Sequence, residues 1–186
     1  MHQLAAAPDL YFSSIKKGRR LRELYQMKLD TIDLHILRVL QQEGSLHNLE
    51  LAKRVALSAS PCSRRVRKLE VDGVIDRYVA VVNPDKIGKS ITLFARVWLK
   101  SQGAEAIEQF SNLVHSLPEV LECHLMASEC HFLLKVVVPD LDAFGLFQLT
   151  YLGNAHGVRS VKTEIPMKTL KSTTALPLQK AMLSGL

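Results

Sequence analysis

The 186-residue chain has little that could hold it together covalently or place it in a membrane. Its three cysteines are odd in number and form no C-x-x-C pair, which argues against a disulfide framework and against the usual zinc spacing. No apolar run approaches the roughly 20 residues that span a bilayer, and no apolar signal core follows the N-terminus. These absences predict a cytoplasmic protein with reduced thiols, no metal, no cofactor and no membrane partner.

Acidic residues are absent from residues 53–68, a stretch that carries six lysines and arginines. Residues 1–82 hold 14 Lys and Arg against 9 Asp and Glu, whereas residues 83–186 hold 10 against 9. The net charge of +6 therefore lies mainly in the first half of the chain. A positive excess confined to one half indicates that this half faces a polyanion.

The acid-free stretch contains the pattern of a short amphipathic helix. Cys62, Val66 and Leu69 recur at helical spacing and share one side. Ser58 is a favourable N-cap residue for this helix. The opposite side carries hydroxyl and cationic side chains, which suit base edges and phosphates in the DNA major groove. A cationic face can also be a solvated surface, but the segments before it favour the DNA-binding interpretation.

Two shorter amphipathic helices are predicted upstream at the spacing of a helix-turn-helix. Asp30 can cap the first of them, and Asn48 can cap the second. Residues 74–82, which follow the cationic helix, read as extended chain with Arg77 near the middle, as expected of a wing strand. The pattern therefore predicts a winged helix-turn-helix.

The predicted DNA contacts lie on the polar side of the cationic helix and on the wing: Ser58, Ser60, Pro61, Ser63, Arg64, Arg67, Lys68 and Arg77. Arg64 and Arg67 lead this group, because a guanidinium can pair bidentately with guanine or clamp a phosphate. Arg65 flanks the apolar stripe, so it is expected to pair with a carboxylate instead. Lys53 and Arg54 remain open between phosphate contacts and solvated charges.

The second half of the chain alternates between strand and helix patterns in the order β-α-β-β-α-β, which is typical of a ferredoxin-like fold. The predicted fold class is therefore α+β. Two helices cover only one face of a four-stranded sheet, yet Phe94 and Trp98 point away from Leu93 and Val97 on the first strand. The uncovered apolar face predicts a homodimer at least, with a second copy of the sheet as partner.

Several ordered motifs extend across residues 28–177. They are Leu29-Asp30-x-x-Asp33, Leu51-Ala52-x-Arg54-Val55-x-Leu57-Ser58, Pro61-Cys62-x-x-Arg65-Val66-x-x-Leu69-Glu70-x-x-Gly73, and Tyr78-x-Ala80 followed by Asn83-Pro84. This series resembles the Lrp/AsnC (leucine-responsive, or feast/famine) family of transcriptional regulators. The resemblance implies a DNA-binding winged helix-turn-helix, an effector-binding and oligomerisation domain, and dimers that assemble further, often to octamers.

The domain boundaries follow from these patterns. Residues 1–27 form a flexible or misassigned N-terminal extension, with Met27 as an alternative start, and residues 28–82 form the winged helix-turn-helix. A linker over 83–90 leads to the ferredoxin-like ligand-binding and oligomerisation domain at 91–170, and residues 171–186 form a C-terminal tail.

The chain departs from the family pattern at two places. The turn before the cationic helix has Ala56 where the family usually has glycine. In the hairpin of the second domain, the family's Gly-x-x-Asp positions are occupied by Ser128 and His131. The resemblance implies that this hairpin binds the effector, through Met126, Ala127, Ser128, Glu129 and His131. An amino-acid ammonium would lose its anionic partner there, so the hairpin binds a different ligand, binds none, or uses Glu129.

The sequence therefore predicts a sequence-specific, DNA-binding transcriptional regulator of amino-acid or nitrogen metabolism genes. An amino acid or another small molecule is the predicted effector. Catalysis is not expected: a sirohaem-decarboxylase-like enzyme would need Tyr and Arg in the run at residues 122–126, and both are missing. A DNA-architectural protein without an effector is the other alternative. Cys62 is expected to be a small core residue, and the spacing of Cys123 and Cys130 with their neighbouring histidines does not suit a metal.

Overall fold

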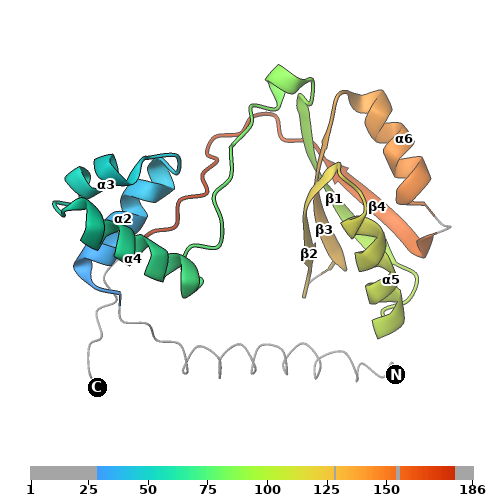
Figure 1. Cartoon of the computed structure of the whole chain (residues 1–186). Coiled ribbons are helices and arrows are strands. Elements are labelled where there is room, and N and C mark those ends of the chain that lie inside the picture. Colours follow the sequence, from blue (N-terminus) through green and yellow to red (C-terminus); the bar gives the residue numbers. More distant parts are fainter. Residues whose placement is uncertain (1–28, 128, 154–155, 179–186) are drawn as a thin grey trace. The chain divides into compact units, whose positions relative to one another are not determined.

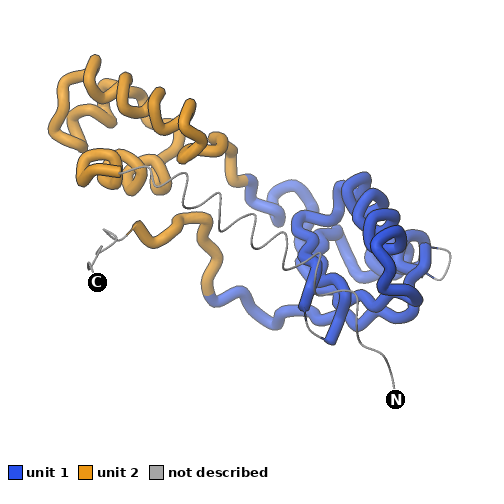
Figure 2. The backbone as a smooth tube through the Cα atoms, turned by 90° about the horizontal axis from the view of Figure 1, so that it is seen from below, with its two compact units in different colours: residues 1–17, 82–170 blue, residues 18–81, 171–186 orange. Residues whose placement is uncertain are grey.

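A computed structural model describes residues 29–127, 129–153 and 156–178 (Figure 1). The predicted extension at residues 1–27 lies outside the described residues, as does Ser128. The described chain divides into two compact units, coloured separately in Figure 2. We call residues 29–81 with 171–178 the helical unit and residues 82–170 the sheet unit. None of the described helices is both long and apolar enough to cross a bilayer.

The helical unit contains α2 (Thr31–Gln42), α3 (Asn48–Arg54) and α4 (Ala59–Val71), as the sequence predicts. Asp30 caps α2 in a reciprocal capping box: its carboxylate accepts a 2.8 Å bond from the Asp33 amide, and Asp33 accepts one from the Asp30 amide at 3.2 Å. The apolar sides of the three helices meet in one core, with Ile36, Leu51 and Cys62 buried in it.

Two local predictions for the helical unit were wrong. His47, not Asn48, is the N-cap residue of α3, and the Asn48 side chain instead donates a 2.9 Å bond to the Ala59 carbonyl oxygen in α4. Residues 74–82, the predicted wing strand, form no strand within the described chain, and Val79 and Val81 are exposed. A strand requires a ladder partner for its backbone groups, and no described segment supplies one here.

The sheet unit has the predicted order of elements. A short 3-10 turn, η1 (Asp85–Ile87), precedes β1 (Ile91–Leu99), α5 (Ala104–His115), β2 (Val120–Leu125), β3 (Phe132–Val138), α6 (Leu141–Tyr151) and β4 (Val158–Glu164). The paired strands are antiparallel, in the spatial order β2-β3-β1-β4. This topology confirms the ferredoxin-like prediction.

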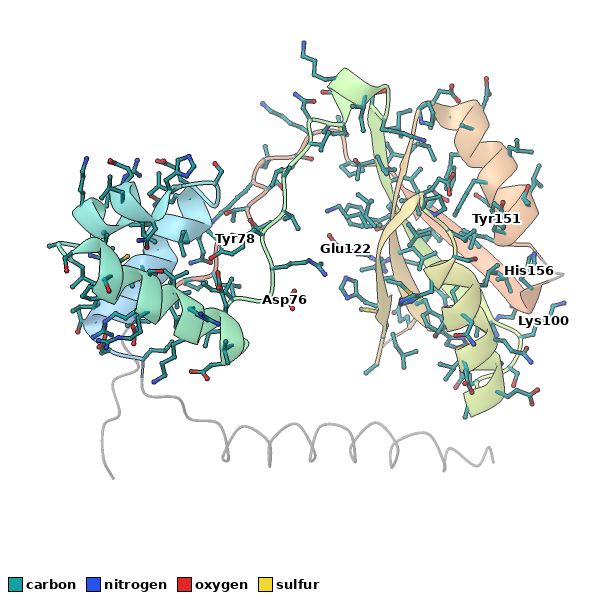
Figure 3. The ribbon with its side chains drawn as sticks, in the orientation of Figure 1. Asp76, Tyr78, Lys100, Glu122, Tyr151 and His156 are labelled. Atoms are coloured by element: carbon teal, nitrogen blue, oxygen red, sulfur yellow. The ribbon has the colours of Figure 1, made fainter. Side chains whose placement is uncertain are left out.

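The two faces of the sheet differ as the strand pattern requires. Helices α5 and α6 cover one face (Figure 1), where Leu93, Val97 and Leu134 are buried beneath them. The other face carries Phe94 and Trp98, both half-buried, together with charged side chains. Those charges are paired across strands, Arg96 with Glu164 at 3.2 Å and Lys135 with Glu122 at 2.8 Å. The uncovered face is therefore a mixed surface, less apolar than the sequence pattern suggests; Glu122 is labelled on it in Figure 3.

Candidate nucleic-acid interface

Helix α4 has one buried side and one exposed side, as predicted. Cys62 is 0% exposed and Leu69 is 3% exposed, and half-buried Val66 packs against the same core. The opposite side projects the side chains of Ser60, Ser63, Arg64, Arg67 and Lys68 into solvent, while Pro61 is half-buried. The helix thus presents hydroxyls and cations on a rigid support, since its apolar side is anchored in the core.

Three cations of α4 are unpaired in the described structure. The side chains of Arg64, Arg67 and Lys68 make no hydrogen bond or ion pair with any described residue. No acidic residue lies in the first turn of α4. Because no described carboxylate neutralises these three charges, they can attract an external polyanion.

Arg65 behaves differently from its neighbours. Its Nη1 atom donates to Asp30 Oδ2 at 2.6 Å and to Asp33 Oδ1 at 2.7 Å, which confirms the expected carboxylate pairing. The Asp33 amide and the Arg65 guanidinium together lower the pKa of Asp30 below its ordinary value. Arg65 therefore ties α4 to the N-terminus of α2 and helps to fix the orientation of the cationic side.

The two cations of α3 are also paired with carboxylates. Arg54 forms a bidentate pair with Glu43, at 2.8 and 2.9 Å, and lies 3.8 Å from Glu50. Lys53 lies 3.6 Å from Glu50. The Glu43 hydrogen bond raises the pKa of Arg54. The sequence left Lys53 and Arg54 open between phosphate contacts and solvated charges, but in the structure both pair with carboxylates of the helical unit.

The turn between α3 and α4 positions the first residues of the cationic helix. Ser58 is the N-cap residue, as expected, but its side chain makes no capping bond and remains exposed. Ala56, in the same turn, has a φ of 56°. A left-handed backbone is costly for any residue with a Cβ, which explains why related turns favour glycine at this position.

Replacing Ala56 with glycine is expected to raise the free energy of unfolding of the helical unit by about 1 kcal/mol, because the left-handed strain is relieved. Chemical denaturation of the full chain, followed by helicity, measures the change. Ala52→Gly, in the interior of α3, is the matched control and should be destabilising by a similar amount. A loss of stability in Ala56→Gly would contradict the assignment of strain.

The chain beyond α4 packs back on the helices. The Tyr78 hydroxyl donates to Glu70 Oε1 at 3.0 Å, and burial together with this bond raises the tyrosine pKa to about 12. Figure 3 labels Tyr78 beside the helices. Arg77, the predicted wing contact, is exposed and lies 3.7 Å from Asp76. Tyr78 therefore anchors the segment that carries Arg77.

The hairpin between β2 and β3 is bonded to the end of β1 and the residues that follow it. The Leu99 amide donates to His131 Nδ1 at 2.8 Å, and the Gln102 amide lies 2.8 Å from His131 Nε2. The Trp98 indole donates to the Glu129 carbonyl oxygen. Burial and the nearby Arg159 lower the pKa of His131. His131 is therefore a neutral acceptor for the backbone at neutral pH and supplies no anion to a ligand.

The pKa of His131 predicts a dependence of stability on pH. In the folded chain its pKa lies below the ordinary value of 6.5. The neutral His131 ring therefore contributes its full share to the free energy of unfolding above pH 6.5, and this contribution is lost as pH falls through the folded pKa. The melting temperature of the full chain should fall between about pH 7.5 and about pH 5.5, and His131→Gln should fall less. An identical fall in both proteins would contradict this role.

The other predicted hairpin residues are distributed unevenly. Glu129 and Ala127 are exposed, Met126 is half-buried, and Ser128 lies outside the described residues.

Cys62 and Cys130 are buried, and Cys123 is exposed. Within the described chain, no group of three His, Cys, Asp or Glu side chains could hold a metal ion.

A winged helix-turn-helix joined to a ferredoxin-like unit defines a two-domain, ligand-responsive class of DNA-binding protein, and comparison with known proteins gives the family. Residues 29–76 match the family model of the winged helix-turn-helix DNA-binding domain, and residues 92–176 match that of the Lrp/AsnC ligand-binding domain. The chain belongs to the Lrp/AsnC family and is a DNA-binding transcriptional regulator with an effector-binding domain.

Its relatives include proteins and structures of this type. The leucine-responsive regulatory protein of Escherichia coli K12 is 38% identical over 151 residues, which cover 81% of this chain and 92% of that protein. A Neisseria meningitidis transcriptional regulator solved with L-methionine has a TM-score of 0.78 at 39% identity, covering 81% of this chain and 97% of that one. An AsnC-family regulator from Agrobacterium tumefaciens has a TM-score of 0.76 at 39% identity, covering 80% and 97%.

Sequence reasoning missed the contacts made by residues 171–178. The last described residues of the chain contact α2, where the Arg38 side chain bonds to the backbone of Leu178 and the Gln41 side chain bonds to the backbone of Leu176. The Leu-Pro-Leu run at 176–178 was the available signal, because proline stiffens an extended segment between two apolar side chains.

Proposed function

We propose that the exposed side of α4 reads duplex DNA. The observation that carries this proposal is a difference among the cations. Arg54 and Arg65 pair with carboxylates, whereas Arg64, Arg67 and Lys68 are exposed and pair with none of the residues that the structure describes. The guanidinium groups suit guanine edges or phosphates. The proposed contacts also include Ser58, Ser60, Pro61, Ser63 and Arg77.

The sheet face away from the helices supports a homodimer that presents two such helices. Phe94 and Trp98 lie there with no described helix over them, among cross-strand ion pairs. Covering the ion pairs has a desolvation cost, which is partly offset because each charge keeps its partner. Two recognition helices require half-sites about 34 Å apart, or a multiple of that distance.

Trp98→Ala is expected to weaken the homodimer about 30-fold, because aromatic anchors near the centre of an interface carry much of its binding energy. Trp98→Phe keeps the ring without the indole N–H that bonds to Glu129, so it separates loss of the interface from loss of the hairpin bond. Analytical ultracentrifugation measures both dissociation constants. An unchanged assembly in Trp98→Ala would remove the argument for this face.

We propose that the hairpin at 126–131 takes a small effector, with an apolar amino acid as the first class to test. The matched ligand-binding domain and the L-methionine complex of a 39% identical relative support this choice. His131 already accepts a backbone bond, so the exposed carboxylate of Glu129 is the proposed partner for the ammonium group. The regulated genes would then serve amino-acid or nitrogen metabolism.

The protein is proposed to act in the cytoplasm by binding, not by catalysis. Selection of bound fragments from genomic DNA, with and without L-methionine or L-leucine, tests DNA recognition and the effector together. Enriched fragments whose occupancy changes with one amino acid, and less so in Glu129→Gln, are the expected result. Enrichment with no response to any amino acid would favour an architectural role. Binding no stronger than to a neutral polymer at low salt would reject the proposal.

A further inference from the structure

Helix α2 binds a C-terminal segment of the same chain. The Gln41 side chain forms hydrogen bonds with both backbone groups of Leu176: its Oε1 accepts from the Leu176 amide at 2.6 Å, and its Nε2 donates to the Leu176 carbonyl oxygen at 3.2 Å. One turn earlier, Arg38 donates to the Leu178 carbonyl oxygen at 2.7 Å. Residues three apart on a helix share a face, so Arg38 and Gln41 form a rail along which the segment runs.

The segment is suited to this rail by its sequence. Pro177 fixes its own φ and restricts Leu176 to extended conformations, so little backbone freedom remains to be lost on docking. The Leu178 side chain is half-buried and packs against the core of the helical unit, whereas Leu176 is 71% exposed. Docking therefore combines three hydrogen bonds from α2 side chains to the backbone of the segment with one apolar contact, that of Leu178.

The docking changes how the two units are connected. The chain leaves the helical unit after Val81, forms the sheet unit, and returns at Lys171 (Figure 2). Within the described residues, two stretches of chain join the units while the segment is docked, and only the stretch after α4 would join them if it were released. A second connection removes relative motion and thus lowers the entropy lost when both units must adopt one arrangement.

We propose that residues 171–178 are a C-terminal strap, which restricts the helical unit so that the two copies in a dimer engage two DNA half-sites together. This role rests on the proposed function, since it presumes paired recognition helices. The strap would act on affinity for two-half-site DNA, where pre-organisation matters, and would leave binding to one half-site unchanged.

Gln41→Ala in the full chain removes both bonds to Leu176, and Gln42→Ala is the matched control, since the next glutamine on α2 is exposed and makes no bond to any described residue. Hydrogen exchange at the Leu176 amide should be about tenfold faster in Gln41→Ala than in the parent or control. Affinity for a duplex with two half-sites, selected as above, should fall roughly threefold to tenfold, with affinity for one half-site unchanged. A chain ending at Leu170 should reproduce both results on DNA.

Three outcomes would overturn the strap. Unchanged Leu176 exchange in Gln41→Ala would show that the segment does not dock through this rail. Equal losses of affinity for one and for two half-sites would show that the segment only stabilises the helical fold. Far-ultraviolet circular dichroism would then show lower helicity in the variant. Equal affinities of the chain ending at Leu170 and the parent would remove its effect on DNA. A parent that binds no duplex would instead reject the proposed function, while exchange still reports docking.

Discussion

Replacing both Arg64 and Arg67 with alanine is expected to lower affinity for the selected duplex by about a hundredfold, because each guanidinium contact contributes about 1–3 kcal/mol. The slope of log affinity against log salt should become shallower by up to about 2, because each lost phosphate contact removes about one unit from it. Fluorescence anisotropy across a salt series measures both quantities. Helicity should be unchanged, because both side chains are exposed and bond to no described residue.

A charge-matched control separates local contact from general attraction. Lys86→Ala with Lys168→Ala likewise removes two positive charges, from exposed positions of the sheet unit. If this pair weakened binding as much as the α4 pair, the effect would be long-range attraction and not contact. Single substitution of Arg64 then separates the two kinds of contact: loss of preference at one base position marks base recognition, and a uniform loss across sequences marks a phosphate contact.

Phe132→Ala is expected to lower the free energy of unfolding of the sheet unit by about 3–5 kcal/mol, through lost transfer energy and a cavity. Phe132 is 2% exposed, and its ring centroid lies 4.7 Å from that of Phe110 on α5. The ring therefore joins β3 to the helical layer. Thermal unfolding by calorimetry should show a large downward shift of the sheet-unit transition.

Leu149→Ala on α6 is the control for this prediction, because Leu149 is 81% exposed in the single chain. Its effect should stay within about 0.5 kcal/mol. If Phe132→Ala cost no more than the control, Phe132 would not be part of a packed core. If the unfolding transition of the helical unit shifted together with that of the sheet unit, the two units would unfold cooperatively.

The candidate interface shows what sequence spacing can achieve. The helical spacing of Cys62, Val66 and Leu69 identifies the buried side of α4, and therefore the exposed cations, because the period of a helix fixes which residues share a side. It also places Arg65 at the flank. Spacing could not decide the fate of Arg54, however, because its partner Glu43 lies in another part of the helical unit.

The effector hairpin shows the opposite balance. The sequence marks Ser128 and His131 as departures from the family pattern, but it cannot say what replaces the missing acid. The structure gives the His131 ring a different task, since its Nδ1 accepts from the Leu99 amide. That bond depends on how β1 and β3 are registered in the sheet, which is set by packing between strands and not by local spacing.

The amino-acid sequence by itself determined the helix-turn-helix, the α+β order of the sheet unit and the cationic side of α4. These follow from periodicity and capping, which act between residues close along the chain. Tertiary structure alone decided which cations lack a partner among the described residues, that residues 74–82 form no strand there, and that Leu176 bonds to Gln41. The reason is physical: a bond between residues 135 positions apart leaves no periodic trace in either segment.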